Sequence, residues 1–462
     1  MSRLNDILND YANKNPVRFH MPGNKGKINI NVSTDVTELF FTDNLYNPDS
    51  DTGIIHELEN RIAECFFPNL NNIHSIISCG GATLCIQTAI LSLLRMNTEN
   101  LNQDKFLICD RLSHISLINT LALLNITPLW VYADNYSEDF ITCIKDYSEI
   151  YGNAVIGVFV TSPDYYGRLK NIKSIAEVCK KYSLTLITDN SHGSHLAFHN
   201  HGKLHPINLG ADMSVDSVHK TLPALTGAAV LHTNKRFDKE LLLRSSVRAF
   251  ASTSPSFLIL QSIENMTEYL SANGYDKHKI LLENINNFKS GAEDIGFKFD
   301  YFSTEPYRIV LCVKLLENIT NISGGEFLYK YLYAKNIVCE FFDSNNVILI
   351  PSILNAEDDF DILLDALRDF TGEYKFCSQP SASVNREKLS VSHRPVAAIS
   401  LFAALKLPRE KISANKAKGR ISAEALAIYP TGVPVILPGE LIDENNIGSI
   451  KQICEYIDVI VN

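Results

Sequence analysis

Residues 211–227 read ADMSVDSVHKTLPALTG, and this stretch decides how the rest of the chain is interpreted. A strand-like run, Met213 to Val218, leads directly into His219 and Lys220, and a proline and a glycine then break the pattern. We therefore expect Lys220 at the end of a rigid element rather than on a solvated helix face. A lysine amine in such a place forms a Schiff base when burial and nearby charge depress its pKa. Taken alone, however, a His-Lys pair beside a turn is more often an ordinary surface lysine.

A second candidate site lies where a strand predicted over Ile73 to Cys79 meets a helix predicted over Leu84 to Leu94. The connection is Gly80-Gly81-Ala82-Thr83. Backbone N–H groups at the N-terminus of a helix bind phosphate in this kind of arrangement. Because any α/β protein contains several strand–glycine–helix turns, the pattern alone is weak evidence for an anion site.

The stretch from Ser217 to Leu222 resembles the cofactor-lysine motif of the ornithine/lysine/arginine decarboxylase family, which uses pyridoxal 5'-phosphate (PLP). The likeness recurs in order along nearly the whole chain, at residues 19–23, 161–167, 189–195 and 429–434. The resemblance implies an α/β fold class with a PLP-dependent transferase-like (fold type I) large domain. That domain is expected to hold a mostly parallel seven-stranded sheet and to be joined by a small α+β domain and a C-terminal domain.

The resemblance also implies the chemistry. Lys220 would hold PLP as a Schiff base that the substrate amine displaces, and Lys220, with His219 or His192 nearby, would return a proton after CO₂ leaves. Asp189 ends a hydrophobic strand and would pair with the ring nitrogen, which keeps the ring an electron sink; a helix N-cap is its alternative role. The predicted catalytic residues are Lys220, His219, His192 and Asp189.

Contacts to the cofactor are implied at two further segments. His114 follows a strand at 106–109 and would stack on the ring, the alternative being an ordinary loop histidine. Thr253 lies in a hydroxyl-rich helix start and would reach the phosphate of a partner subunit, so we expect a homodimer with shared active sites; further assembly is left open. The predicted cofactor-binding residues are Gly81, Ala82, Thr83, His114, Asp189, Ser191, His192, Ser217, His219, Lys220 and Thr253.

Several positions depart from the family pattern. Asn24 replaces a histidine, Gly81 and Ala82 replace hydroxyl residues, and Gly227 stands where glutamine is common. These departures keep open a degenerate paralogue without catalysis. A different PLP reaction (transamination, aldol cleavage or elimination) is a second alternative, because no carboxylate-binding arginine can be assigned. Arg18, Arg111 and Arg168 are candidates only.

The expected reaction is decarboxylation of a basic amino acid. Arginine, converted to agmatine in polyamine biosynthesis, comes first, since the chain resembles the compact bacterial form of the family without a receiver-like N-terminal domain. Lysine and ornithine follow, and the sequence does not separate the three. Glu440 either contacts a cationic substrate tail or is a solvated or helix-capping glutamate.

Composition limits the remaining functions. The chain has 462 residues, 45% of them hydrophobic and 20% charged, and its net charge of −10 is dispersed, which argues against a nucleic-acid partner. No apolar run reaches the roughly 18 residues that span a bilayer, and the N-terminus lacks an apolar signal core. The ten dispersed cysteines are typical of reduced thiols in a cytoplasmic protein. His195 and His199 have helical spacing, but no Glu or Cys nearby completes a ligand set, so no metal is predicted.

Changes in pattern suggest four segments. An amphipathic helix with Leu4, Ile7, Leu8 and Tyr11 on one face begins the chain. Alternating strands and helices follow, and the pattern then changes to short strands with one helix over 358–367. A polar stretch at 377–383 reads as a linker. The predicted segments are an N-terminal arm (1–20), a large PLP-binding domain (21–290), a small α+β domain (291–375) and a C-terminal domain (376–462).

Overall fold

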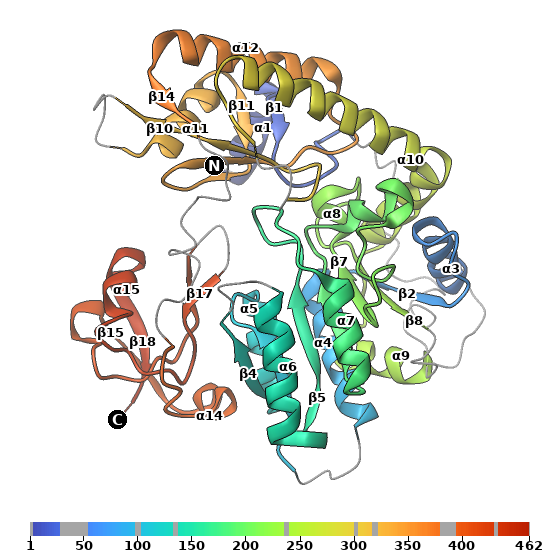
Figure 1. Ribbon diagram of the computed structural model, residues 1–462, viewed down its shortest axis with the longest axis vertical. Coiled ribbons are helices and arrows are strands. Elements are labelled where there is room, and N and C mark those ends of the chain that lie inside the picture. Colours follow the sequence, from blue (N-terminus) through green and yellow to red (C-terminus); the bar gives the residue numbers. More distant parts are fainter. Residues whose placement is uncertain are drawn as a thin grey trace.

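The computed structural model describes residues 3–27, 54–97, 103–132, 137–234, 240–299, 304–316, 322–378, 394–428 and 433–461. Figure 1 shows three parts: a large α/β part at the lower right, a smaller part at the top and a C-terminal part at the lower left. The long helix α10 (Phe257–Asp294) runs from the large part along the small one.

A seven-stranded sheet forms the centre of the large part, which confirms the predicted fold class. All neighbouring strands pair in parallel except β8, which is antiparallel to both of its neighbours. The strands, in spatial order, are β2 (Ile73–Ser78), β8 (Ala229–Asn234), β7 (Met213–Asp216), β6 (Thr185–Asp189), β5 (Val155–Thr161), β3 (Phe106–Asp110) and β4 (Thr127–Val131).

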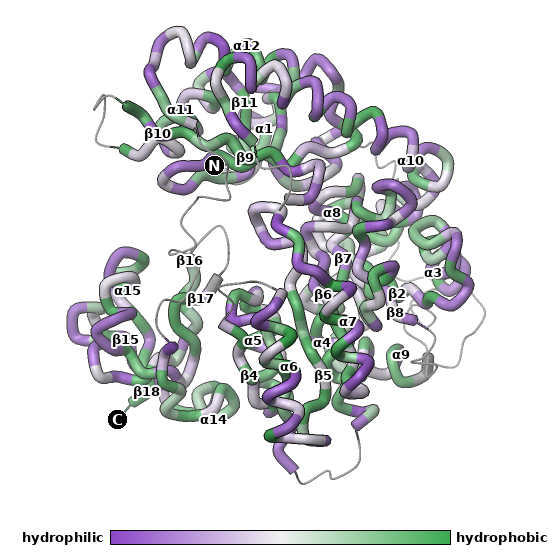
Figure 2. The backbone as a smooth tube through the Cα atoms, in the orientation of Figure 1, coloured by the Kyte–Doolittle hydropathy of each residue, from purple (hydrophilic) through white to green (hydrophobic). Residues whose placement is uncertain are grey.

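Helices cover both faces of this sheet, so its central strands are hydrophobic on both sides. Phe159 of β5 faces the core that includes α4 and α5, whereas Val158 and Val160 face the core under α6 and α7. Figure 2 shows hydrophobic residues concentrated in these inner strands. The helices of the large part are α3 (Ile54–Phe66), α4 (Gly81–Met96), α5 (Ile115–Leu124), α6 (Glu138–Tyr151), α7 (Ile172–Lys181), α8 (Val218–Thr221), α9 (Glu240–Arg248) and α10.

The small part is built from the chain segments that precede and follow the large part. The N-terminal strand β1 (Val17–Phe19) pairs in parallel with β11 (Ile337–Cys339), so the segment after helix α1 (Arg3–Lys14) joins this part. Ile7 and Leu8 of α1 are each 56% exposed. The remaining elements are β9 (Ile309–Cys312), β10 (Lys314–Leu315), α11 (Gly324–Ala334), β12 (Phe341–Phe342), β13 (Asn346–Leu349), α12 (Glu357–Glu373) and β14 (Phe376–Cys377).

The C-terminal part has its own core around Ile436, Ile450 and Val459. Its elements are α14 (Leu401–Lys406), β15 (Arg409–Ser413), β16 (Leu426–Ile428), β17 (Val433–Ile436), α15 (Ile447–Ile453) and β18 (Tyr456–Ile460). Residues 429–432 of the predicted family motif and most of the predicted linker lie outside the described residues. The predicted domain limits stay a prediction. Within the described residues, no helix is both long and apolar enough to cross a membrane.

A buried ion pair joins the C-terminal part to the large sheet. Arg111 Nη2 lies 3.1 Å from Glu440 Oε2, its Nη1 donates to the Pro434 carbonyl at 2.9 Å, and the two side chains are 1% and 4% exposed. The guanidinium also lies over the Trp130 ring, 5.7 Å from its centroid. The sequence-based alternatives for Glu440 were therefore wrong: it is neither solvated nor facing the cavity described below. Burial raises its pKa, and Arg111 opposes that rise.

We predict that Glu440→Ala destabilises the protein by about 3–5 kcal/mol, because the guanidinium of Arg111 would stay buried without its carboxylate. The change is measured by urea unfolding followed through Trp130, the single tryptophan of the chain. Glu326→Ala, which removes the exposed i,i+4 partner of Lys330, is the control and should cost much less. Equal effects of the two variants would contradict the structural role of the Arg111–Glu440 pair.

Candidate active site

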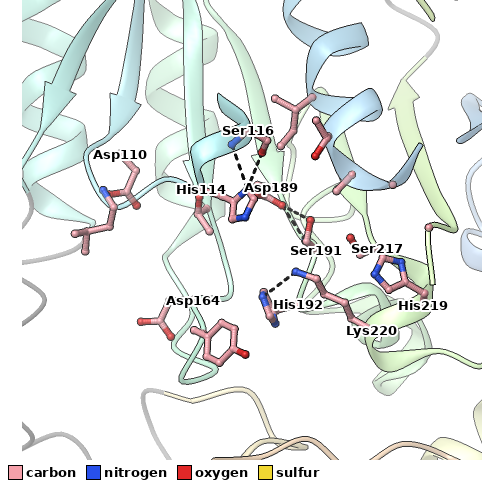
Figure 3. A pocket seen from close by; sticks show the side chains of 18 of the residues that line it. Asp110, His114, Ser116, Asp164, Asp189, Ser191, His192, Ser217, His219 and Lys220 are labelled. Atoms are coloured by element: carbon pink, nitrogen blue, oxygen red, sulfur yellow. Dashed lines mark hydrogen bonds between the residues drawn. The ribbon is translucent and has the colours of Figure 1, made fainter. Parts of the chain in front are cut away.

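The parallel strands place a cavity at their carboxyl edge, where open α/β sheets bind ligands. Asp110, Thr161 and Asp189 end β3, β5 and β6, Ser217 directly follows β7, and all four line this cavity. Its volume is about 360 Å³, within the range of small-molecule sites. Figure 3 shows the polar side chains converging on it.

The fold brings together ten of the eleven residues predicted to bind a cofactor, although they come from four separate segments of the chain. The ten that line the cavity are Gly81, Ala82, Thr83, His114, Asp189, Ser191, His192, Ser217, His219 and Lys220. Thr253 is exposed on the loop before α10 and does not line it. Its predicted contact with a partner subunit stays a prediction.

Lys220 and His192 meet near the centre of the cavity. Lys220 Nζ lies 3.0 Å from His192 Nε2 (Figure 3). The sequence placed Lys220 at a strand end, whereas the structure ends β7 at Asp216 and puts Lys220 in the one-turn helix α8. Desolvation is the main cause that lowers the pKa of Lys220, and Arg308 lowers it further against Asp189 and Glu340.

His192 is neutral at physiological pH, because desolvation and then the charge of Lys220 hold its pKa well below the usual value. With Nε2 accepting from Lys220, the ring proton sits on Nδ1. Among the described residues, buried Nδ1 has no hydrogen-bond partner. A buried donor without an acceptor favours a ligand atom at this position.

Asp189 and His114 lie on the adjoining wall. Asp189 Oδ1 accepts hydrogen bonds from Ser191 Oγ at 2.5 Å and Ser191 N at 3.1 Å, which fixes the carboxylate in its rotamer. His114 caps α5, since its Nδ1 accepts from Ser116 N at 3.2 Å. His114 is therefore a helix cap rather than the ordinary loop histidine of its alternative reading, Asp189 bonds to Ser191 without capping a helix, and both also face the cavity.

The N-terminus of α4 forms one end of the cavity. No side chain of the described residues caps this helix, and its first amide, that of Gly81, donates to the Gly227 carbonyl at 2.8 Å. Gly81 has φ +67°, and a Cβ there would meet no atom within 4 Å. The hydroxyl of Ser217, buried at the same cavity, has no hydrogen-bond partner among the described residues. Open space, uncapped amides and an unpaired hydroxyl fit a phosphate group.

The N-terminal loop that contains Gly23 and Asn24 packs against the turn that carries Lys220. Gly23 N donates to the His219 carbonyl at 2.8 Å, and a Cβ at Gly23 would lie 2.6 Å from the Leu222 oxygen, so only glycine fits. Asn24, where the family has a histidine, is buried and donates from Nδ2 to the Ala224 carbonyl at 3.1 Å. In this chain the position therefore anchors the loop to the turn that carries Lys220.

The three arginines considered for the substrate carboxylate do not line the cavity. Arg111 forms the ion pair with Glu440. Arg18 donates to the Lys25 carbonyl at 2.5 Å, and Arg168 lies over the Tyr166 ring. Other residues that line the cavity were not predicted, among them Asp110, Lys170, Asp164, Tyr165 and Tyr166. The last three belong to residues 161–167, which resemble the family but had no predicted role, so a signal was present in the sequence.

The histidine-rich segment after His192 serves other contacts. His195 Nε2 lies 3.2 Å from Glu305 Oε2, and His199 Nδ1 lies 3.2 Å from the Tyr307 hydroxyl. In the part of the chain that the structure describes, no group of three or more His, Cys, Asp or Glu side chains is arranged to hold a metal ion.

Comparison with known proteins gives consistent results. The family model described as the Orn/Lys/Arg decarboxylase major domain matches residues 3–315, and that of the C-terminal domain matches residues 382–461. Similar curated proteins are the arginine decarboxylases of Halalkalibacterium halodurans (27% identical, 96% of this chain, 91% of the relative) and Bacillus subtilis (26%, 96% and 91%). The solved E. coli constitutive lysine decarboxylase has the same fold, with a TM-score of 0.68 at 18% identity over 90% of this chain and 73% of that one.

Lys25, in the loop that covers the lysine turn, supports a prediction about pH. Its ammonium is buried and donates to the carbonyls of His20 (2.6 Å) and Ile350 (2.7 Å). Burial lowers its pKa to about 7, whereas an unfolded lysine titrates near about 10.4. Between these values the unfolded chain binds a proton that the folded chain does not, so stability should rise with pH by up to about 1.4 kcal/mol per unit.

We predict that Lys25→Met removes this rise, measured as the free energy of unfolding at pH 7, 8 and 9. Lys27→Met is the matched control, because Lys27 lies two residues away with a side chain 48% exposed. Identical pH slopes in the wild type and the Lys25 variant would show that Lys25 keeps its proton in the folded protein.

Proposed function

The chain belongs to the ornithine/lysine/arginine decarboxylase family, and we propose that it removes the α-carboxyl group of arginine as CO₂, with PLP held at Lys220. It is an amino-acid decarboxylase. The observation that carries the proposal is the contact of Lys220 with His192 in a cavity that also holds Asp189 and the uncapped start of α4. We choose arginine over lysine and ornithine because curated proteins that are similar to this one over most of its chain are named arginine decarboxylases.

The residues present fit PLP. The first turn of α4, with Ala82, Thr83 and the hydroxyl of Ser217, would hold the phosphate, and His114 would lie against the ring. Asp189, with its rotamer fixed by Ser191, would accept a hydrogen bond from the protonated ring nitrogen. When bound, PLP supplies a protonated ring that takes up the electron pair left on the substrate as CO₂ departs.

Lys220 and His192 are the residues proposed for proton transfer. The lowered pKa of Lys220 increases its share of neutral, nucleophilic amine, and neutral His192 accepts a hydrogen bond from it. In its protonated ammonium form, Lys220 Nζ is the proposed donor of the proton that replaces the carboxylate, and the neutral amine that remains can hydrogen-bond to His192 Nε2 at 3.0 Å. His219 is less suited, because its Nδ1 lies 2.8 Å from the Ala228 carbonyl.

We further propose a homodimer in which Thr253 serves the partner's site, which is compatible with its exposed place on the loop before α10. We propose a cytoplasmic location because none of the ten cysteines, all within the described residues, forms a disulfide, and six of them are buried.

We predict that borohydride reduction of the PLP-loaded protein attaches the cofactor to Lys220. Mass spectrometry of the digest should find the adduct on the Lys220 peptide, and Lys220→Ala should lose both the adduct and CO₂ release from arginine. Lys170 lines the same cavity but lies 2.6 Å from Asp110 Oδ2, so it serves as the internal control. An adduct on Lys170 would refute the assignment.

We predict that Asp189→Asn lowers kcat for arginine decarboxylation by about a hundredfold or more, since it removes the charge that keeps the ring protonated. The amide oxygen of Asn retains the acceptor for Ser191, so folding should be unaffected. Ser191→Ala, which leaves the charge and removes one orienting bond, should lower kcat much less. A Ser191 effect as large as that of Asp189 would show that orientation, not charge, is the contribution of this residue.

A further inference from the structure

Two buried side chains of the small part reach the segment that carries His192. Glu305 and Arg308 stand just before β9, with side chains 1% and 0% exposed, and the proposed function uses neither of them. Arg308 Nη2 lies 3.4 Å from the His192 carbonyl oxygen, and Glu305 Oε2 lies 3.2 Å from His195 Nε2. The small part therefore contacts residues 192–195 of the large part at both ends of that segment.

The same two residues pack against the loop that follows β5. Glu305 N donates to the Gly167 carbonyl at 2.6 Å. A Cβ at Gly167, which has φ +84°, would lie 2.7 Å from Arg308 Cβ and 3.3 Å from Glu305 Cγ. Glycine at this position leaves room for both side chains and adopts the backbone conformation without strain. The backbone therefore fixes the place from which Arg308 reaches His192.

The carboxylate of Glu305 links the two contacts with the large part. Its Oε1 lies 3.5 Å from Arg308 Nε, and its Oε2, which faces His195, also accepts from Tyr307 N at 2.7 Å. Burial raises the pKa of Glu305, but His195, Arg308 and the hydrogen bonds outweigh burial and lower the pKa to about 2. Glu305 is therefore ionised, and it shares one negative charge among several neighbours.

Glu305 does not satisfy all the donors of Arg308. Among the described residues, the buried Nη1 of Arg308 has no hydrogen-bond partner. Because the carboxylate is shared, the positive charge of Arg308 is only partly compensated and acts on groups nearby. Desolvation is the main cause that lowers the pKa of Lys220 and of His192, and Arg308 lowers the pKa of both further.

Glu340 is the other charged residue of the small part that acts on Lys220. Its carboxylate accepts from Met21 N at 2.7 Å and from the Tyr165 hydroxyl at 2.5 Å. Desolvation lowers the pKa of Lys220, whereas the charges of Asp189 and then of Glu340 raise it. Glu340 therefore favours the ammonium form of Lys220, in the opposite sense to the arginine.

The other titratable groups around Lys220 belong to the large part. Besides Asp189 and His192, they are Asp110, His114, Asp164, Tyr165, Tyr166, Lys170 and His219, which line the same cavity. Among the charges that act on Lys220, those of Arg308 and Glu340 therefore connect it to the small part, and they have opposite signs.

We propose that Arg308 is a positioning residue for the decarboxylation: it supports His192 at the backbone carbonyl and acts on Lys220 through its positive charge. Arg308 does not line the cavity, so it has no contact with the substrate in this role. The inference rests on the proposed function, because the contact between Lys220 and His192 matters for catalysis only if Lys220 carries the cofactor. The reactivity of Lys220 then depends on how the small part packs against the large one.

The amine of Lys220 is tested in the full chain without PLP, so this readout needs no turnover. A trace of acetic anhydride at pH 7 labels neutral amines, and mass spectrometry compares the Lys220 peptide with that of Lys330, whose side chain is 60% exposed. Arg308→Gln should slow the labelling of Lys220 by about threefold or more, because loss of a nearby positive charge favours the unreactive ammonium form. Arg308→Lys keeps the charge and should stay within about twofold of the wild type.

Glu340→Gln is the control for a general loss of structure. The oxygen and the amide of Gln can keep the contacts with Met21 and Tyr165, but the lost negative charge should make the labelling of Lys220 faster. Arg368→Gln, which removes a 54% exposed arginine of α12, should change nothing. An unchanged or faster rate in Arg308→Gln, or slower labelling in both Arg308→Gln and Glu340→Gln, would overturn the proposal.

Turnover of the PLP-loaded protein is the second readout. Arg308→Gln should lower kcat for arginine by about tenfold and leave KM within about twofold, since Arg308 positions His192 and does not touch the substrate. Arg308→Lys should restore part of kcat. A higher KM with unchanged kcat would place Arg308 at the substrate and refute the positioning role. If the wild type released CO₂ from no basic amino acid, the proposed function would fail, and the labelling comparison would still decide whether Arg308 acts on Lys220.

Discussion

Parallel pairing of β6 with β7 is the constraint on which the site depends. The register aligns Ile187 with Met213 and Asp189 with Val215, so the two strands deliver Asp189 and the Lys220 turn to one edge of the sheet. A slip of one residue would turn every side chain of a strand to the other face. Buried polar contacts hold the register just beyond the strands: Asn190 N donates to the Val215 carbonyl at 2.9 Å, and Asn190 Nδ2 donates to Asp216 Oδ2 at 3.0 Å.

The charge of Asp216 is itself compensated. His205 Nε2 lies 3.0 Å from the same carboxylate oxygen, and Ser214 Oγ donates to the other oxygen at 2.6 Å. Burial raises the pKa of Asp216, but His205 and the hydroxyl outweigh it and the pKa is lowered overall. A buried hydrogen-bond network that engages both carboxylate oxygens of Asp216 holds these side chains in place. It therefore fixes the position of residues 189–192, which include the contact with Lys220, relative to the sheet.

At the positions that depart from the family pattern, backbone contacts and one side-chain amide replace the contacts of the usual side chains. Where hydroxyl side chains are usual, Gly81 leaves open space and its amide pairs with the Gly227 carbonyl. Gly227 has φ +99°, a conformation that side chains disfavour, and Asn24 uses its amide to anchor the loop over the lysine turn. These substitutions preserve the packing around Lys220, which argues against a decayed site.

Hydrophobic periodicity predicted the alternating strands and helices, whereas the seven-stranded sheet and the residues expected at the cofactor came from the family resemblance. Ten of those residues meet in the cavity because parallel strands gather the local features at their carboxyl ends at one edge of the sheet. Contacts between distant segments were decided only by tertiary structure. Glu440 meets Arg111 across 329 positions, and Glu340 meets Tyr165 across 175. No local pattern encodes such pairs, because each depends on how separately folded parts of the chain pack against one another.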